Sequence, residues 1–289
     1  MATVSQWVAG ARPRTLPNSV VPVAVGTGVA FGLEAAVWWK ALLALLVAVA
    51  LQVGVNYAND YSDGVRGTDE NRVGPLRLTA TRLAAPRQVF AAAWVCFAVA
   101  AVVGLVLVAV SSWWLLLVGA VAIAAAWFYT GGRTPYGYRA LGEVSVFVFF
   151  GLVAVAGTVF VQAGTVPWRG WAAAVAVGLL SCAMLVVNNI RDLPTDAVSG
   201  KRTLAVVLGD RGARLLFVGC VAGAFVAALA TAVGAWWVLL AVLSAPLAVR
   251  PCARVLRGET GPDLVRGLGE TGRLQMAFGV LFTVGLALG

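Results

Sequence analysis

The sequence predicts an all-α integral membrane protein with nine transmembrane helices, and three observations support this fold class. Of the 289 residues, 61% are hydrophobic and only 11% are charged, whereas soluble domains are about 45–50% apolar and about 25% charged. Long apolar segments recur along the whole chain, and the basic residues fall on alternate connections between them. Residues 1–289 are therefore expected to form one transmembrane domain.

Nine segments approach the length of about 20 mostly apolar residues that a membrane span requires. They are 15–33, 40–58, 88–110, 112–130, 142–163, 171–190, 214–233, 235–250 and 272–288. The first follows Arg12 and Arg14 and lacks a clear small-residue cleavage site. We therefore expect a retained helix and not a signal peptide.

The lysines and arginines predict the orientation of these helices. With the N-terminus in the cytoplasm, 19 of the 21 basic residues lie on cytoplasmic connections, and only Lys40 and Arg169 lie on the other side. In short loops such a bias marks the cytoplasmic face. We expect a multi-pass protein of the plasma membrane, in contact with the lipid bilayer. The net charge of +9 then reflects the topology of the chain. Nucleic-acid binding is excluded, because membrane spans interrupt the positive charge every few residues.

The residue types present narrow the possible chemistry. The chain has no histidine, which excludes histidine-based catalysis and most zinc sites. Its four cysteines are far apart and show no C-x-x-C spacing. We expect them to be small packing residues.

Seven of the twelve acidic residues fall in two stretches, each at the end of a predicted span. Four of them, Asp60, Asp63, Asp69 and Glu70, belong to the first stretch, which begins NYANDYSDGVRGTD at Asn56. The other three, Asp192, Asp196 and Asp210, belong to the second, which begins NNIRDLPTD at Asn188. Asn56 and Asp60 recur as Asn188 and Asp192, at an offset of 132 residues that equals four helices. This offset suggests two similar four-helix units followed by a ninth helix.

Residues three or four apart share a helix face, so each stretch can direct two carboxylates into one cavity. Such carboxylates repel unless a cation lies between them, and oxygen-only ligands suit Mg²⁺, which also binds phosphate. The sequence therefore predicts a Mg²⁺–diphosphate site. Basic residues near the two stretches would hold the remaining phosphate charge: Arg66, Arg72, Arg77, Lys201 and Arg202. The simpler interpretation is that acids and bases pair with each other at the membrane surface.

A diphosphate in an apolar bundle suggests an allylic isoprenoid diphosphate as substrate. Mg²⁺ would make its diphosphate a better leaving group, and aromatic faces would stabilise the allylic cation. The aromatic residues nearest the motifs are Tyr57, Tyr61, Tyr129 and Tyr136, although most aromatic residues of a membrane protein face lipid or the core.

Two further segments offer polar groups to the same cavity. In the loop 129–139, Arg133 could cap the diphosphate and Arg139 could hold an anionic co-substrate; alternatively, both arginines only set the topology. Asn18 could enter the cavity from the first helix, or the proline-rich segment around it could be a plain helix start.

The two motifs at the ends of the second and sixth helices resemble the UbiA superfamily of membrane aromatic prenyltransferases, over essentially the whole chain. The strings NDYSDGVRGTDENRVGPLRL, YTGGRTPYGYRALGEV and NNIRDLPTDAVSGKRTLAVVLGD are similar to the branch that prenylates 1,4-dihydroxy-2-naphthoate. The resemblance implies a helical bundle with a central cavity and an active site on the cytoplasmic side. It implies catalytic and Mg²⁺-binding roles for Asp60, Asp63, Asp192 and Asp196, and diphosphate-binding roles for Asn56, Asn59, Asn188, Lys201 and Arg202.

The resemblance also implies the reaction. A polyprenyl group would pass from its diphosphate to the ring carbon that carries the carboxylate of the naphthoate, with loss of CO₂ and diphosphate, giving demethylmenaquinone for menaquinone biosynthesis. One departure concerns the last acid of the superfamily pattern N-D-x-x-D-x-x-x-D. Position 67 is glycine here, and the next acid is Asp69, which is a further expected ligand.

Two alternatives remain open at this stage. The same donor chemistry could act on another acceptor, such as 4-hydroxybenzoate or a phosphoribosyl sugar. The acids could instead form a divalent-cation transport path, which would require polar groups midway along the helices. The acids cluster at one face, and the opposite face has only Glu34, which disfavours transport.

Overall fold

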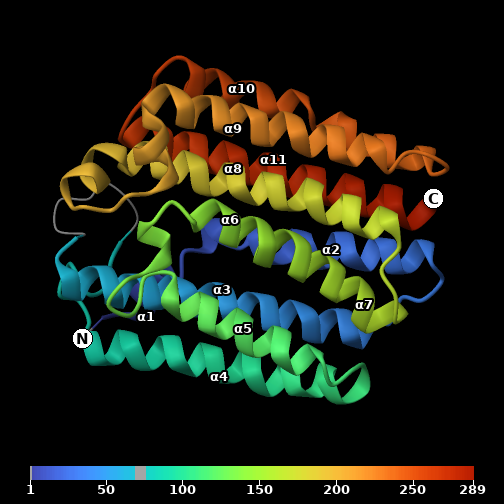
Figure 1. The fold of residues 1–289 in the computed structure, drawn as a ribbon, viewed down its shortest axis with the longest axis horizontal. Coiled ribbons are helices and arrows are strands. Elements are labelled where there is room, and N and C mark those ends of the chain that lie inside the picture. The colour runs from blue at the N-terminus through green and yellow to red at the C-terminus, as the bar shows by residue number, and fades with distance from the viewer. Residues whose placement is uncertain (1, 69–75) are drawn as a thin grey trace.

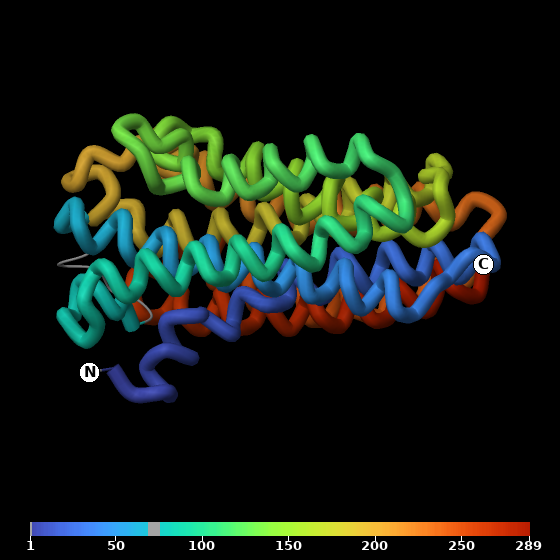
Figure 2. Tube along the Cα trace, turned by 90° about the horizontal axis from the view of Figure 1, so that it is seen from below, coloured from blue at the N-terminus to red at the C-terminus, as the bar shows by residue number. Residues whose placement is uncertain are grey.

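The computed structural model describes residues 2–68 and 76–289, which form a bundle of helices running along one long axis (Figure 1). Within these ranges there is no β-strand, only an isolated bridge between Arg139 and Arg202. The all-α fold class predicted from the sequence is therefore confirmed. The short helix α1 lies outside the main bundle, at one of its ends (Figure 2).

The elements follow one another with short connections. They are α1 (Val4–Gly10), η1 (Pro13–Thr15), α2 (Pro17–Gly32), α3 (Trp38–Arg66), α4 (Pro86–Val110), α5 (Leu115–Phe128), η2 (Tyr136–Tyr138), α6 (Gly142–Val146), η3 (Phe147–Ala156), α7 (Gly157–Ala163), α8 (Trp168–Val198), α9 (Leu204–Ala230), η4 (Trp236–Ser244), α10 (Pro246–Leu256) and α11 (Pro262–Leu288). α6, η3 and α7 form one continuous helical path whose middle part is π-helical.

Six of these helical paths are long and apolar enough to cross a membrane, and the pair η4 and α10, bent by 45°, makes a seventh. The chain is therefore a multi-pass membrane protein. Among the described residues, helices coincide with all nine predicted ranges, but two of them are shorter than a standard span. α2 has 16 residues and α5 has 14.

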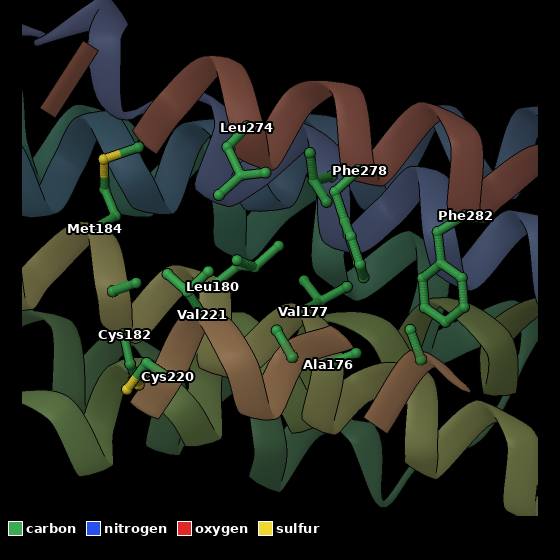
Figure 3. Packing of buried hydrophobic residues seen from close by; sticks show 14 of the residues in the cluster. Ala176, Val177, Leu180, Cys182, Met184, Cys220, Val221, Leu274, Phe278 and Phe282 are labelled. Atoms are coloured by element: carbon green, nitrogen blue, oxygen red, sulfur yellow. The ribbon is translucent and has the colours of Figure 1, made fainter. Parts of the chain in front are cut away.

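Helix α8 lies at the centre of the bundle. Of its most apolar window 72% is buried, against 28% for α3. Large residues of α11, including Phe278, pack against small residues of α8 such as Ala176 (Figure 3). Lipid is as apolar as these side chains, so close packing and not removal from water stabilises such contacts. Gly151 and Gly178 let η3 and α8 approach closely, since a Cβ on Gly151 would lie 2.6 Å from the Cα of Gly178.

Two glycines set where the helices near the motifs end or bend. Gly67 terminates α3 with a φ of 74°, and Gly209 interrupts α9 with a φ of 71°. Positive φ is accessible to glycine at little cost but strains other residues. Helix α3, which carries the first motif, therefore does not continue past residue 67.

One end of the bundle gathers the connections that carry the motifs. The end of α3, the α5–α6 connection and the α8–α9 connection lie together at the left of Figure 1. Lys40 and Arg169 lie at the opposite end, where Lys40 Nζ donates to the carbonyl of Val161 and Arg169 Nη2 donates to the carbonyl of Val233, each over 2.7 Å. Lys40 and Arg169, the two basic residues predicted to lie on the other side of the membrane, are therefore at the end opposite the motifs.

Candidate active site

A cavity of about 510 Å³ opens between α2, α3, α4, α5, the α6–α7 path and α8. Apolar residues form most of its wall. Its polar lining residues are Arg12, Thr15, Asn18, Gln52, Asn56, Asn59, Tyr129, Tyr136, Ser145, Thr158 and Asn188. The expected central cavity is present. Of the eight asparagine and tyrosine residues that the sequence predicts at the site, six line this cavity: Asn18, Asn56, Asn59, Tyr129, Tyr136 and Asn188.

The first motif directs its two aspartates to different partners. Both carboxylate oxygens of Asp60 accept backbone N–H groups, from Leu78 over 2.7 Å and from Thr79 over 2.9 Å. Asp60 is 1% exposed, so these bonds replace its hydration. The carboxylate fixes the segment that follows residues 69–75, and this segment carries Arg77.

Asp63 is the centre of a charged cluster. Its Oδ2 lies 2.9 Å from Lys201 Nζ and 3.6 Å from Arg77 Nη2, and its Oδ1 accepts the Tyr138 hydroxyl over 2.5 Å. The Lys201 ammonium also lies 4.9 Å from the ring centroid of Tyr138. All four side chains are buried or half-buried. Buried charges require such neutralisation, because isolated ones are expensive.

The second motif lies on α8, which continues past it to Val198. Asp192 forms a two-pronged ion pair with its neighbour Arg191, with both N–O distances at 2.7 Å. Asp196, 9% exposed, accepts the backbone N–H of Lys201 through its carbonyl over 3.0 Å. Lys201 therefore connects the motifs, since its backbone binds the second and its ammonium binds the first. The structure confirms that both motifs meet at one end of the bundle.

The helix end at Gly67 explains the departure from the superfamily spacing. An acid at position 67 would have to adopt positive φ, which disfavours residues with a Cβ. The next acid lies beyond the helix. Asp69, expected as a ligand, and Arg72, expected to bind diphosphate, lie outside the described residues, so their roles stay predictions.

The asparagines join separate elements around the cavity. Asn56 Nδ2 donates to the carbonyl of Ala11 over 2.8 Å, and Asn18 Oδ1 accepts from Gln275 over 2.9 Å. Asn59 Oδ1 accepts the Thr130 hydroxyl over 2.8 Å. Asn59 and Asn188 line the cavity. They lie about one helical turn before Asp63 and Asp192, and so mark where the cavity approaches the motifs.

Of the four predicted tyrosines, two line the cavity and two do not. Tyr129 and Tyr136 lie in its wall with their rings edge to face at 5.5 Å. Burial, and then the charges of Glu143, Asp63 and Asp196 among its neighbours, raise the pKa of Tyr129.

Tyr57 and Tyr61 pack elsewhere. The Tyr57 hydroxyl donates to the carbonyl of Trp7 over 2.9 Å, and the Tyr61 ring packs edge to face against Phe90 at 5.1 Å. Neither residue lines the cavity. The prediction that Tyr57 and Tyr61 line the pocket is wrong, because the face of α3 that carries them is turned toward α1 and α4.

The arginines expected at the diphosphate are also separated. Arg66 donates to the carbonyls of Thr130 and Gly132 and so supports the loop 129–139. Arg133, Arg139 and Arg202 line a second pocket, of about 630 Å³, which shares no lining residue with the central cavity. The loop is therefore not a simple cap on the central cavity.

The donor set is compatible with Mg²⁺. Among the described residues, no three acidic or cysteine side chains gather closely enough to hold an ion alone. Mg²⁺ needs only one or two carboxylates, because it retains waters and binds substrate phosphate oxygens. Asp63 and Asp196, which are both bound to Lys201, supply buried carboxylates of that kind.

Comparison with known proteins identifies the family. Residues 19–266 match the UbiA prenyltransferase family. The chain belongs to this family. This UbiA chain is 54% identical to the 1,4-dihydroxy-2-naphthoate octaprenyltransferase of Mycobacterium tuberculosis, over all of this chain and 99% of the relative. It is 37% identical to the protein of the same name from Escherichia coli, over 98% and 95% of the two chains.

Solved structures show the same fold at low sequence identity. A UbiA homologue from Archaeoglobus fulgidus, solved with GPP and Mg²⁺, has a TM-score of 0.66 and 17% identity, covering 96% of this chain and all of that one. The apo homologue from Aeropyrum pernix has a TM-score of 0.69 and 18% identity, covering 93% and 97%. The family predicted from the three motif strings is confirmed.

Several contacts of this UbiA site were missed by sequence reasoning. Tyr138 was treated as part of a turn, yet it is hydrogen-bonded to Asp63. Arg191 was counted only for topology, although it pairs with Asp192. Glu143 accepts Asn189 Nδ2 over 2.8 Å and joins α6 to α8. Only the adjacency of Arg191 to Asp192 offered a signal, because the other partners are separated by 46 residues or more.

Proposed function

We propose that this protein transfers the polyprenyl group of an allylic polyprenyl diphosphate to 1,4-dihydroxy-2-naphthoate, releasing CO₂ and diphosphate and giving demethylmenaquinol, the reduced form of demethylmenaquinone. One observation carries the proposal: an apolar cavity approaches two buried aspartate motifs at the turn marked by Asn59 and Asn188. Such a cavity suits a substrate with an isoprenoid body and an anionic head. The choice of acceptor follows the full-length relatives that carry this name.

In the proposed mechanism, Asp63, Asp192 and Asp196 hold Mg²⁺ at the diphosphate. When bound, Mg²⁺ neutralises the diphosphate and makes it a better leaving group. Lys201 is hydrogen-bonded to Asp63, and Arg77 lies 3.6 Å from the same carboxylate. Both cations therefore lie where they could turn to phosphate oxygens. Asp60 acts indirectly, since it fixes the backbone beside Arg77.

The cavity wall provides for the reaction after the diphosphate leaves. Tyr129 and Tyr136 line the cavity, and aromatic rings there can stabilise a developing allylic cation. The apolar wall excludes water, which would otherwise capture the cation. At the acceptor, the bond to CO₂ breaks as the bond to the prenyl carbon forms, so no ring proton has to be removed there. A chain without histidine can therefore complete the reaction.

We further propose that the chain crosses the plasma membrane nine times, with the motif end on the cytoplasmic side. α2 and α5 would be the two spans in addition to the seven that length and composition support. Of the 21 basic residues, only Lys40 and Arg169 fall away from the motif end, as the positive-inside rule requires for this orientation. Cytoplasmic substrates would then reach the motifs directly.

The test is an assay of purified protein in lipid with a long-chain allylic diphosphate, 1,4-dihydroxy-2-naphthoate and Mg²⁺, read by mass spectrometry. We expect the decarboxylated prenyl product, its loss with EDTA and its recovery when Mg²⁺ is restored. A product with 4-hydroxybenzoate alone would contradict the acceptor. Unchanged turnover in EDTA would contradict the metal site.

A further inference from the structure

The second pocket, of about 630 Å³, differs from the central cavity in composition and position. It is formed by the α5–α6 connection and the start of α9, and is lined by Arg133, Thr134, Pro135, Tyr138, Arg139, Ala140, Gly200, Arg202 and Val207. Three of its side chains are arginines and none is acidic. We refer to it as the arginine pocket.

The three arginines of this pocket have no acidic partners within the described part of the chain. All three are exposed, and none of them forms one of the ion pairs found there. By contrast, Arg191, Arg214 and Arg254 each pair with an aspartate or a glutamate. The arginine pocket is thus a concentration of positive charge that residues 2–68 and 76–289 leave uncompensated.

Backbone hydrogen bonds hold two of these arginines side by side. Ala140 N donates to the carbonyl of Arg202 over 2.8 Å, and Arg202 N donates to the carbonyl of Tyr138 over 3.1 Å. These bonds form a parallel bridge in which Arg139 and Arg202 are paired residues. Like charges on paired residues repel each other. An anion between the two guanidinium groups would remove that repulsion, and phosphate oxygens match the fork of arginine donors.

The pocket also borders the membrane-spanning surface. α6 begins at Gly142 and α9 begins at Leu204, soon after the paired residues Arg139 and Arg202. Val207 lines the pocket and is 52% exposed, and Leu141, which follows the lining residue Ala140 in the chain, is 48% exposed. An occupant of the pocket would therefore have a charged head at the arginines and an apolar body along these side chains. Basic pockets next to transmembrane helices bind anionic lipid headgroups in this manner.

We propose that the arginine pocket binds the phosphate group of an anionic phospholipid from the surrounding membrane. The site is separate from the central cavity, and the proposal does not depend on the reaction. A second source of the same chemistry is free diphosphate, such as the product of a prenyl transfer. The apolar border favours the lipid, because a free diphosphate has no apolar part to place there.

The experiment is a lipid titration of the full-length protein in detergent, followed by native mass spectrometry. The probes are dioleoyl-phosphatidylglycerol, dioleoyl-phosphatidylcholine and inorganic diphosphate. The variants are Arg139→Gln with Arg202→Gln, and Arg133→Gln alone. Arg87→Gln is the matched control, since Arg87 is also exposed near the motif end but does not line the pocket.

We expect phosphatidylglycerol to remain bound more strongly than phosphatidylcholine to the wild type and to Arg87→Gln. The double variant should bind it about tenfold more weakly or worse, because each arginine contributes to the attraction of an anionic headgroup. The proposal is overturned if the double variant binds phosphatidylglycerol as the wild type does, or if the two lipids bind equally. It is also overturned if the variants lose only the binding of diphosphate.

Arg133→Gln keeps the test decisive if the double variant does not fold. Its side chain is exposed, and its backbone is not part of the bridge. Folding is checked for each variant by its thermal unfolding in phosphatidylcholine nanodiscs. Addition of phosphatidylglycerol should raise the unfolding temperature of the wild type, and should raise that of Arg133→Gln by less. An equal rise in both would contradict the site.

Discussion

The two aspartate motifs share the spacing of Asn56 to Asp60 and of Asn188 to Asp192, but they hold their carboxylates in different ways. In the first, helix α3 ends at Gly67, and its aspartates bind groups that are distant in sequence, namely Leu78, Thr79, Tyr138 and Lys201. In the second, helix α8 continues to Val198, and Asp192 pairs with its neighbour Arg191. The first motif therefore organises the surrounding connections, whereas in the second the pair of Asp192 with Arg191 lies within a single helix.

Within the first motif, the two aspartates also differ in their partners, although the sequence predicts the same role for both. Asp60 is occupied by backbone N–H groups, while Asp63 faces movable cations. A lysine can exchange a carboxylate for a phosphate when substrate enters, but a backbone N–H group that shapes a turn cannot do so without unfolding the turn. We therefore expect Asp63 and Asp60 to respond differently to the same substitution.

The largest effect should come from Asp63→Asn and Asp192→Asn, one from each motif. If both carboxylates hold the metal and its diphosphate, each variant should lose about 1,000-fold in kcat, since metal stabilisation of a leaving group is worth several kcal/mol. The assay is product formation under saturating substrates. Asp263→Asn is the matched control, because Asp263 is an exposed acid in the first turn of α11. Near wild-type turnover in either motif variant would contradict a shared site.

A smaller and different effect is expected from Asp60→Asn. The amide can accept only through one of its two terminal atoms, so one N–H bond of Leu78 or Thr79 is lost. Hydrogen bonds to charged groups contribute about 1.5–3 kcal/mol, and we expect a loss of that size in the free energy of unfolding. The Mg²⁺ concentration for half-maximal activity should stay close to the wild-type value. A large rise in it would make Asp60 a direct ligand and remove the distinction from Asp63.

Most of the fold could be predicted from the sequence because it follows from long-range regularities. Apolar length located all nine helical ranges, and the positions of Lys40 and Arg169 identified the end opposite the motifs. The meeting of the two motifs was also predicted correctly from the spacing of Asp60 and Asp192. These features depend on the average properties of whole segments.

The individual contacts were not predictable in the same way. Tyr57 and Tyr61 lie close to the first motif in sequence, but the rotation of α3 turns them away from the cavity. Tyr138 binds Asp63 across 75 residues, and only the folded α5–α6 connection brings them together. Arg139 and Arg202 are joined by backbone hydrogen bonds, which carry no residue-type signal.

The end of α3 offers a test of why the first motif departs from the superfamily spacing. Gly67→Asp restores an acid at the expected position but places a Cβ at a φ of 74°. The left-handed conformation costs about 1–2 kcal/mol for such residues, and we expect a loss of that size in stability, with no gain in Mg²⁺ affinity. Gly67→Asn is the control for charge, because asparagine has the same shape. A gain in Mg²⁺ affinity in Gly67→Asp alone would show that the helix end can admit an additional ligand.

The smallest expected change concerns the two tyrosines that lie near the motifs. Burial and nearby carboxylates raise the pKa of Tyr129 and that of Tyr138 above the ordinary value, which is about 10. The folded protein then keeps a proton that the unfolded chain would release. Their contribution to stability is complete below the ordinary pKa and is lost only as the pH rises through the raised one.

Absorbance of tyrosinate during an alkaline titration measures this directly. Tyr138→Phe should leave the absorbance change near pH 10 unaltered, because Tyr138 still holds its proton there in the wild type and still donates it to Asp63. The same substitution should lower kcat only modestly, since Lys201 and Arg77 continue to neutralise Asp63. If Tyr138→Phe removed part of the change near pH 10, the hydroxyl would be exposed to solvent and the first motif would be less enclosed than its contacts indicate.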